Sequence, residues 1–295
     1  MADAALAVHG GAGPMPREPF DPGPYAQALE AALDAGWSRL ERGGSALDAV
    51  QAAVEVLEDA PLFNAGRGSV LTSAGTVEMD AALMSGADRR AGAVACVTRV
   101  RHPVALAREA MERTPHVMLC GRGAERFADE LGLDLMKPDW FVTAHERERL
   151  ARRQTALAEQ GGGTVGAVAR DQGGDLAAAT STGGVRGQLP GRVGDSPIVG
   201  TGTYADELCA VSATGSGEAL IRAVGAHEIA SLVRHAGVPL AEAAERVLRD
   251  GVRPLGGAAG LIALGADGEP VMPFTTEAMY RGWRAGGDPP RTAIG

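Results

Sequence analysis

The chain has 295 residues, of which 45% are apolar and 22% charged, and its formal net charge is -9. This composition is typical of a globular protein that buries a sizeable core without disulfides. The acidic balance, with no run of five basic residues, argues against a nucleic-acid partner. The sequence has no run of 18 apolar residues and no charged segment at its start, so we expect neither a membrane span nor a signal peptide. Three widely spaced cysteines fit neither a disulfide framework nor a metal site and favour a reducing cytoplasm: Cys96, Cys120 and Cys209.

The first half of the chain mixes strand and helix patterns. Residues 5–14 predict a strand that runs into a glycine turn. Residues 24–44 predict a helix, because Pro24 suits a first turn and apolar residues share one face. Ser45 is predicted to cap a second helix that ends near Glu58. The other elements predicted before residue 160 are a loop and short strand over 63–72, strands over 75–86, 91–100 and 116–121, and helices over 102–112, 123–131 and 139–159.

The second half begins with a predicted hairpin. Two apolar stretches, 164–170 and 176–184, flank the glycine-rich turn 171–175. Because hairpins require antiparallel pairing and helices separate the groups of strands, we expect one layered sheet-and-helix domain over residues 1–295. The remaining predicted elements are a strand over 208–217, helices over 217–236 and 240–250, and a hairpin over 260–274.

Three glycines run directly into a threonine at the start of that hairpin, in "GGGTVGAVARD" (161–171). One interpretation is a nucleotide-binding loop, because Gly161, Gly163 and Gly166 fit G-x-G-x-x-G. That motif needs a strand before it and a helix after it, and here the order is reversed. A second interpretation is a flexible loop that ends at a strand, since β-branched residues such as Thr164 favour strands.

The third interpretation is a self-cleavage site between Gly163 and Thr164. A threonine hydroxyl needs a base to act as a nucleophile. Cleavage would free the α-amino group of Thr164, whose ordinary pKa of about 7.7–8.0 lets it accept a proton near neutral pH. Gly163 can adopt the strained geometry in which the hydroxyl reaches the preceding carbonyl. One residue would then supply both the nucleophile and the base.

The sequence around this junction resembles the plant-type asparaginase and isoaspartyl peptidase family of N-terminal-nucleophile hydrolases. The resemblance is most specific in "GTVGAVARDQGGDLAAATSTGGVRGQLPGRVGDSPIVGTGTYAD" (163–206). Further similar segments run nearly end to end in the family's order: "HGGAG" (9–13), "FNAGRGSVL" (63–71), "EMDAALMSG" (78–86), "ATGSGE" (213–218) and "PFTTEAMYRGW" (273–283). The resemblance favours the cleavage interpretation and implies an amidohydrolase acting on L-asparagine and β-aspartyl dipeptides.

Two alternative functions stay open. One is a glycosylasparaginase-like hydrolase, although that relative usually has an Asp-Thr junction where this chain has Gly163-Thr164. The other, from a different class, is a non-catalytic nucleotide-binding module built on the glycine pattern.

The resemblance implies roles for five catalytic residues. Thr164 would be the nucleophile and, through its freed amine, the base. Thr182 would hydrogen-bond the nucleophile. Thr214 and Gly215 would form an oxyanion hole from a hydroxyl and a main-chain N–H. Asn64 would help to organise the site.

The resemblance also implies how the substrate is held. Arg192 would bind the α-carboxylate and Asp195 the α-ammonium, since a guanidinium fork matches a carboxylate. The carbonyl of Gly217 would contact the same ammonium, and Thr214 and Gly215 would complete the substrate-binding set. From the residues alone, an ordinary surface ion pair of Arg192 and Asp195 is the favoured interpretation.

At the level of the fold, the resemblance implies an α+β architecture, the four-layer αββα sandwich of N-terminal-nucleophile hydrolases. It would be built from both fragments of a self-cleaved precursor, an α subunit 1–163 and a β subunit 164–295, with each sheet taking strands from both. Two such heterodimers would associate, and no organic cofactor is expected. Gly10, Gly11 and Gly13 would let the backbone pack closely beside Thr164.

A structural sodium ion is also implied, because hard cations prefer oxygen ligands. Its ligands would be main-chain carbonyls near Leu57, Glu58, Phe63, Ala65 and Arg67. The chain departs from the family in its linker: only about four residues, from Gln160 to Gly163, separate the charged helix from Thr164, where the family usually has more.

Overall fold

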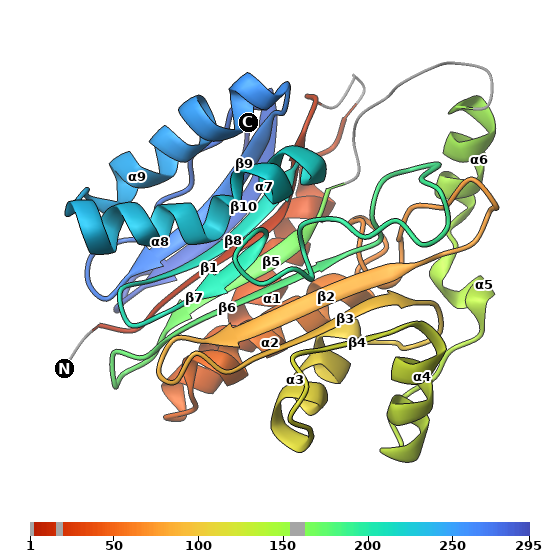
Figure 1. Cartoon of the computed structure of the whole chain (residues 1–295), viewed down its shortest axis with the longest axis horizontal. Helices are drawn as coiled ribbons and strands as arrows, with labels where there is room; N and C mark the ends of the chain where they lie inside the picture. The colour runs from red at the N-terminus through yellow and green to blue at the C-terminus, as the bar shows by residue number, and fades with distance from the viewer. Residues whose placement is uncertain (1–2, 16–19, 154–162) are drawn as a thin grey trace.

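A computed structural model describes residues 3–15, 20–153 and 163–295. In this part of the chain the largest element is a sheet of eight strands in the order β11-β10-β1-β5-β6-β2-β3-β4 (Figure 1). Every neighbouring pair is antiparallel except β3 and β4. The strands are β1 (Ala5–Gly13), β2 (Met79–Ser85), β3 (Ala91–Val97), β4 (Met118–Cys120), β5 (Val165–Arg170), β6 (Leu176–Thr182), β10 (Ala278–Ala285) and β11 (Arg291–Ile294).

A second, smaller sheet packs on one face of the first. It consists of β7 (Thr203–Ala205), β8 (Cys209–Gly215) and β9 (Ala259–Gly265), all antiparallel. β8 and β9 contact β1 and β5 of the large sheet. All three strands follow residue 163, so the expectation that each sheet takes strands from both sides of the junction is wrong for this sheet. Its strands all come from residues 203–265, whereas the large sheet interleaves β1 and β2 with β5, β6 and β10.

Helices cover the outer faces of both sheets, as Figure 1 shows. The large sheet is covered by α1 (Gly23–Glu41), α2 (Ala46–Asp59) and α3 (Pro103–Arg113), and the small sheet by α8 (Gly225–Ala236) and α9 (Leu240–Arg246). The other helical segments are α4 (Gly121–Glu130), α5 (Pro138–Phe141), α6 (Ala144–Arg153), α7 (Gly217–Ala223), a π-helical turn (Val247–Val252) and a 3-10 turn (Arg253–Leu255). Within the described residues, no helix is both long and apolar enough to cross a membrane.

The strand β1 shows how the two cores are divided. Leu6 and Val8 belong to the core between the large sheet and its helices, and Ala5 and Ala7 belong to the core between the two sheets. Successive side chains of a strand point to opposite faces, so a strand buried on both faces is apolar throughout. The small alanines on the inner face allow the two sheets to approach each other.

Several sequence predictions are confirmed by these elements. The first strand and the first two helices form as β1, α1 and α2, and the hairpin over 164–184 forms as β5 and β6. Ser45 caps α2: its hydroxyl accepts a hydrogen bond from the Asp48 N–H at 3.2 Å, while the Asp48 carboxylate accepts one from the Ser45 N–H at 3.1 Å. This reciprocal capping box satisfies main-chain donors that the first helical turn leaves free.

Other predictions are wrong in detail. The described segment 63–72 contains turns and no strand, because Gly66 and Gly68 have positive φ angles. The helix predicted over 217–236 divides at Val224, which adopts a left-handed conformation. Only the first arm of the hairpin over 260–274 is a strand, and the second arm makes isolated bridges at Val271 and Phe274.

The predicted charged helix over 139–159 forms as α5 and α6 up to residue 153, and the rest of it, with Gly161 of the glycine motif, lies outside the described residues. Three strands, β7, β10 and β11, were not predicted.

Candidate active site

Three threonines meet where the two sheets face each other. Thr164 directly precedes β5, Thr182 ends β6, and Thr214 lies near the end of β8. The main-chain N–H of Thr164 donates to Thr214 Oγ1 at 3.2 Å, and the Thr164 hydroxyl donates to Thr182 Oγ1 at 3.2 Å. All three residues are buried. The fold therefore places a hydroxyl from each sheet beside Thr164.

The two neighbouring hydroxyls also accept hydrogen bonds from the main chain. Thr214 Oγ1 accepts from the Ala12 N–H at 3.4 Å, and Thr182 Oγ1 accepts from the Gly184 N–H at 3.0 Å. A hydroxyl that accepts in this way still has its own hydrogen to donate. Gly215 follows Thr214 with a φ of +127°, and a Cβ there would lie 2.5 Å from the Ala258 carbonyl oxygen. This position therefore requires glycine.

The glycines of β1 pack against the junction itself. Gly11 has a φ of +112°, and a Cβ on it would lie 2.4 Å from the Cα of Gly163. A Cβ on Gly163 would in turn lie 3.0 Å from the Gly10 carbonyl oxygen. Close packing of Gly10 and Gly11 beside the junction is therefore confirmed. It is not found for Gly13, where an added Cβ would meet nothing within 4 Å.

Asn64 is linked to Thr182 through Gly184, which hydrogen-bonds both residues. Its side-chain amide donates to the Gly184 carbonyl at 2.7 Å and accepts from the Val70 N–H at 2.8 Å. The Gly183 N–H donates to the Asn64 carbonyl at 3.0 Å. Asn64 thus ties the turns after α2 to the residues that follow Thr182, because its side chain bonds Val70 on one side and Gly184 on the other.

Arg192, Asp195 and Gly217 also come together. A Cβ on Gly217 would lie 2.8 Å from both Arg192 Nη2 and Asp195 Oδ1. Asp195 is 4% exposed, and its Oδ2 has no hydrogen-bond partner among the described residues. Burial raises the pKa of Asp195 to about 7, against the opposing influence of Arg192. The ion pair of Arg192 is with Glu218, at 3.0 Å, so Arg192 and Asp195 are not a simple surface pair.

The loop expected to hold sodium presents carbonyl oxygens. The carbonyls of Phe63, Ala65 and Arg67 accept no hydrogen bond from any residue that the structure describes, while that of Glu58 accepts the Arg67 N–H at 2.7 Å. Oxygen donors of this kind fit a hard monovalent cation. No group of three or more His, Cys, Asp or Glu side chains suited to a metal occurs in the described residues.

Two buried titratable residues near the threonines were not singled out in the sequence. His9 is fully buried, its Nε2 lies 2.9 Å from Ser212 Oγ, and that hydroxyl lies 2.7 Å from Thr180 Oγ1. Burial lowers the pKa of His9 to about 3, which keeps it neutral at physiological pH. Asp80 pairs with Thr182 across β2 and β6, and burial raises its pKa to about 6. The histidine of "HGGAG" and the aspartate of "EMDAA" were the available signals, but neither pattern indicates a role.

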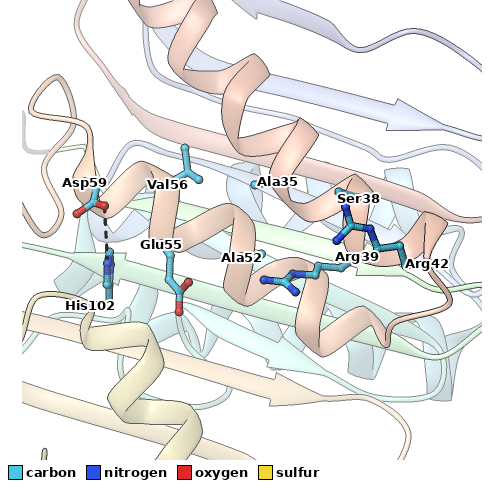
Figure 2. A pocket seen from close by; sticks show the side chains of 9 residues that line it. All are labelled: Ala35, Ser38, Arg39, Arg42, Ala52, Glu55, Val56, Asp59 and His102. Carbon is cyan, nitrogen blue, oxygen red and sulfur yellow. Dashed lines mark ion pairs between the residues drawn. The ribbon is translucent and has the colours of Figure 1, made fainter. Parts of the chain in front are cut away.

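A separate depression of about 390 Å³ lies on the outer helix layer. Figure 2 shows Arg39 of α1 and Arg42, which follows that helix, on one side of it and Glu55 and Asp59 of α2 on the other, with His102 at its edge. α1 and α2 cover the face of the large sheet opposite to the small sheet that carries Thr214. None of the candidate residues lines this depression, so it is distinct from the threonine site.

Comparison with known proteins assigns the chain to a family. A family model described as "Asparaginase" matches residues 2–294, and the chain belongs to that family. It is 49% identical to an isoaspartyl peptidase of Salmonella typhimurium over 310 aligned residues, covering 100% of this chain and 99% of the relative. It is 48% identical to an isoaspartyl peptidase of Escherichia coli, covering 100% and 97%, and 41% identical to a plant-type L-asparaginase of Thermococcus kodakarensis, covering 99% and 100%. The family resemblance seen in the sequence is confirmed.

Proposed function

We propose that the protein hydrolyses the side-chain amide of L-asparagine and the isopeptide bond of β-aspartyl dipeptides, with Thr164 as a nucleophile freed by self-cleavage. The relatives named isoaspartyl peptidase and L-asparaginase support this reaction. The observation that carries the proposal is the position of Thr164. It directly follows Gly163, and its hydroxyl and its main-chain N–H each donate a hydrogen bond to a threonine hydroxyl.

Maturation would begin with attack of the Thr164 hydroxyl oxygen on the Gly163 carbonyl carbon. The peptide bond breaks as an ester forms, and the Thr164 nitrogen takes up the hydroxyl proton. Water then hydrolyses the ester, which leaves a carboxylate on Gly163 and a free α-amino group on Thr164. The close packing of Gly11 against Gly163 fixes the approach of the two groups.

In the mature protein the freed amine would accept the proton from the Thr164 hydroxyl as its oxygen attacks the substrate's side-chain carbonyl. The Thr214 hydroxyl and the Gly215 N–H would stabilise the developing oxyanion; removing one such donor commonly costs about 2.7–4 kcal/mol in the barrier. Ammonia or the second amino acid leaves and a β-aspartyl ester remains on Thr164. Water then releases L-aspartate and restores the hydroxyl.

The substrate's two α charges would be read by Arg192 and Asp195. A buried carboxylate that lacks a hydrogen-bond partner on one oxygen is costly, and a bound ammonium would offset that cost. Gly217 lies beside both side chains, and its carbonyl would take a further hydrogen of the ammonium. Asn64 would keep the loop after Thr182 in place.

We further propose a four-layer αββα sandwich of the N-terminal-nucleophile type, formed as a single domain by fragments 1–163 and 164–295, with two heterodimers in the assembly. The arrangement of helices outside two stacked sheets supports it. A sodium ion would be held by the carbonyls near Leu57, Glu58, Phe63, Ala65 and Arg67, where it would stiffen the turns that carry Asn64. A cytoplasmic location stays a prediction, supported by three unpaired cysteines.

The nucleotide-binding alternative has no support in the geometry. Gly166 lies inside β5, and a Cβ there would meet Ser212 Oγ at 2.0 Å. A phosphate-binding loop needs open backbone at the start of a helix, whereas this glycine is packed between two sheets. The glycosylasparaginase-like alternative differs in the group beyond the aspartyl end of the substrate, and the Gly163-Thr164 junction argues against it.

The proposal is tested by Thr164→Ala and Thr164→Ser. Denaturing mass analysis of the purified native protein is expected to give two chains divided between Gly163 and Thr164. Thr164→Ala is expected to stay as one 30.1 kDa chain without activity on L-asparagine, because it lacks the attacking oxygen. Thr164→Ser keeps that oxygen and is the matched control, which should still divide. Division of the alanine variant at the same bond would exclude Thr164 as the nucleophile.

A further inference from the structure

Glu218 forms an ion pair with one edge of the Arg192 guanidinium. Arg192 Nε donates to Glu218 Oε1 at 3.0 Å, and Arg192 Nη2 lies 3.0 Å from the same oxygen. Glu218 belongs to the first turn of α7, immediately after Gly217, and its side chain is 69% exposed. Ion pairs this exposed contribute little to the stability of a fold.

A guanidinium carries five N–H donors in one plane, so it can bind one partner along each of two edges. Glu218 takes the edge formed by Nε and Nη2, while Nη1 makes a single long contact within the described residues, at 3.4 Å from Gln188 Oε1. The edge formed by Nη1 and Nη2 lies against Gly194 and Gly217, where added Cβ atoms would come within 2.9 Å and 2.8 Å. The guanidinium thus lies where only glycines fit, and neither Gly194 nor Gly217 carries a side chain that could cover this second edge.

We infer that Glu218 is a positioning residue, which holds Arg192 by one edge so that the other edge is presented to the substrate's α-carboxylate. The inference rests on the proposed function, because it takes Arg192 as the carboxylate-binding residue. A long arginine side chain that is already ordered in the free protein loses less entropy when the substrate binds. Glu218 thus acts on affinity through Arg192 and does not contact the reacting atoms.

Glu218 also affects the charge around the ammonium site. The charged groups that influence Asp195 are Arg192 on the same loop, Glu218 on α7 and Asp80 on β2. Glu218 and Asp80 raise the pKa of Asp195, and Arg192 lowers it. Removing the charge of Glu218 is therefore expected to move the acid limb of kcat/KM for L-asparagine to lower pH, whichever residue replaces it.

The test compares Glu218→Ala with Glu218→Gln in the mature protein. Alanine frees Arg192, and we expect KM for L-asparagine to rise about 3- to 10-fold, the factor that corresponds to ordering one long side chain, with kcat changed less than about twofold. Glutamine keeps an oxygen that can accept from Nε and Nη2, so its KM should stay within about twofold of the native value. Glu228→Ala, which removes an exposed glutamate of the neighbouring helix α8, is the matched control and should leave KM unchanged.

A second substrate separates this inference from the proposed function. β-Alaninamide is asparagine without its α-carboxylate, so Glu218→Ala should not change its kcat/KM. An unchanged KM for asparagine in Glu218→Ala, a lower KM, or an equal loss with both substrates would overturn the positioning role. If Arg192→Ala handles asparagine as well as the native protein does, the carboxylate-binding role of Arg192 in the proposed function fails instead. Thermal unfolding of each variant shows whether it is folded.

Discussion

The buried carboxylate of Asp195 is incompletely hydrogen-bonded in the free protein. Its carboxylate is buried, one oxygen has no partner among the described residues, and its pKa is raised from 3.8 to about 7. A carboxyl group whose pKa is raised on folding binds its proton more tightly in the folded state. Stability therefore decreases as pH rises from about 4 to about 7, since the unfolded chain gives up that proton earlier. The ammonium-binding role proposed for Asp195 would therefore come at a cost in the stability of the free protein.

This argument predicts the behaviour of Asp195→Asn. Asparagine has nearly the same shape and no charge to desolvate, so the variant should unfold at a higher temperature than the native protein at pH 8. At pH 4 both side chains are neutral in the folded state, and the difference should be small. Thermal midpoints at the two pH values, measured on chains in the same cleavage state, decide the matter. Activity on L-asparagine should fall, because the neutral side chain no longer attracts an ammonium. An equal difference at both pH values would mean that Asp195 is satisfied in the folded protein.

Part of the site follows from single residues and part does not. The glycine-threonine junction offered a nucleophile at Thr164 as one of three interpretations, because that chemistry needs only this residue and the bond before it, and the family resemblance then selected it. Thr182 and Thr214 came from the family resemblance, since no local pattern brings Thr214 to a residue 50 positions earlier. Glu218 and His9 lie in two segments of the resemblance, "ATGSGE" and "HGGAG", but neither pattern indicates a role. An exposed glutamate in a first helical turn and a histidine before two glycines each have many ordinary explanations.

At the scale of single elements, β1 acts on the junction through the shape of its backbone. Gly11 has a positive φ angle, and its α-carbon faces Gly163 so closely that no side chain fits between them. The strand runs next to β5, so it fixes the residues on both sides of the bond that we propose to be cut.

Gly11→Ala is therefore expected to slow self-cleavage roughly 10- to 100-fold, because displacing a reacting carbonyl by about 1 Å can cost that much. The measurement is the fraction of undivided chain at set times after cell-free synthesis. Gly13→Ala in the same strand is the matched control, since its Cβ would meet nothing within 4 Å and its φ is not positive. Equal rates for the two variants would show that the packing of Gly11 has no effect on the reaction.

Local sequence patterns predict some of the helices and strands and miss others. α1 and α2 were predicted because their periodicity and capping are contained in a few consecutive residues. β10 was missed because its sequence, "AMYRGWRA", includes two arginines and does not alternate. It is a strand because it pairs with β1, some 270 residues earlier, and no local rule reports such a partner. The break at Val224 is equally non-local, since β-branched residues rarely adopt a left-handed conformation.

At the scale of the whole molecule, the two proposed fragments share one sheet. β1 lies between β5 and β10, and β2 pairs with β6, so three ladders join residues before 163 to residues after it. Neither fragment could leave without exposing long strand edges and the apolar core beneath them.

We therefore predict that the divided protein stays together. On gel filtration with light scattering, both fragments should elute in one peak whose mass is close to twice 30.1 kDa, because two heterodimers are proposed to associate. They should part only in denaturant. The undivided Thr164→Ala variant is the control and should elute at the same volume. Separate peaks for the fragments in buffer would contradict the shared sheet, and a mass near 30.1 kDa would contradict the pairing of heterodimers.

The interleaving of β1 with β5 and β10 also affects how the protein recovers from unfolding. Before the bond is cut, all strands belong to one chain, and folding is a first-order process whose rate does not depend on concentration. After the proposed cut, unfolded fragments diffuse apart, and the effective concentration that the peptide link provided is lost. Refolding then becomes a second-order encounter of two chains that each expose unpaired strands, in competition with aggregation. Maturation would thus make the native state persistent but hard to regain, so the lifetime of the active protein would be set by its rate of unfolding.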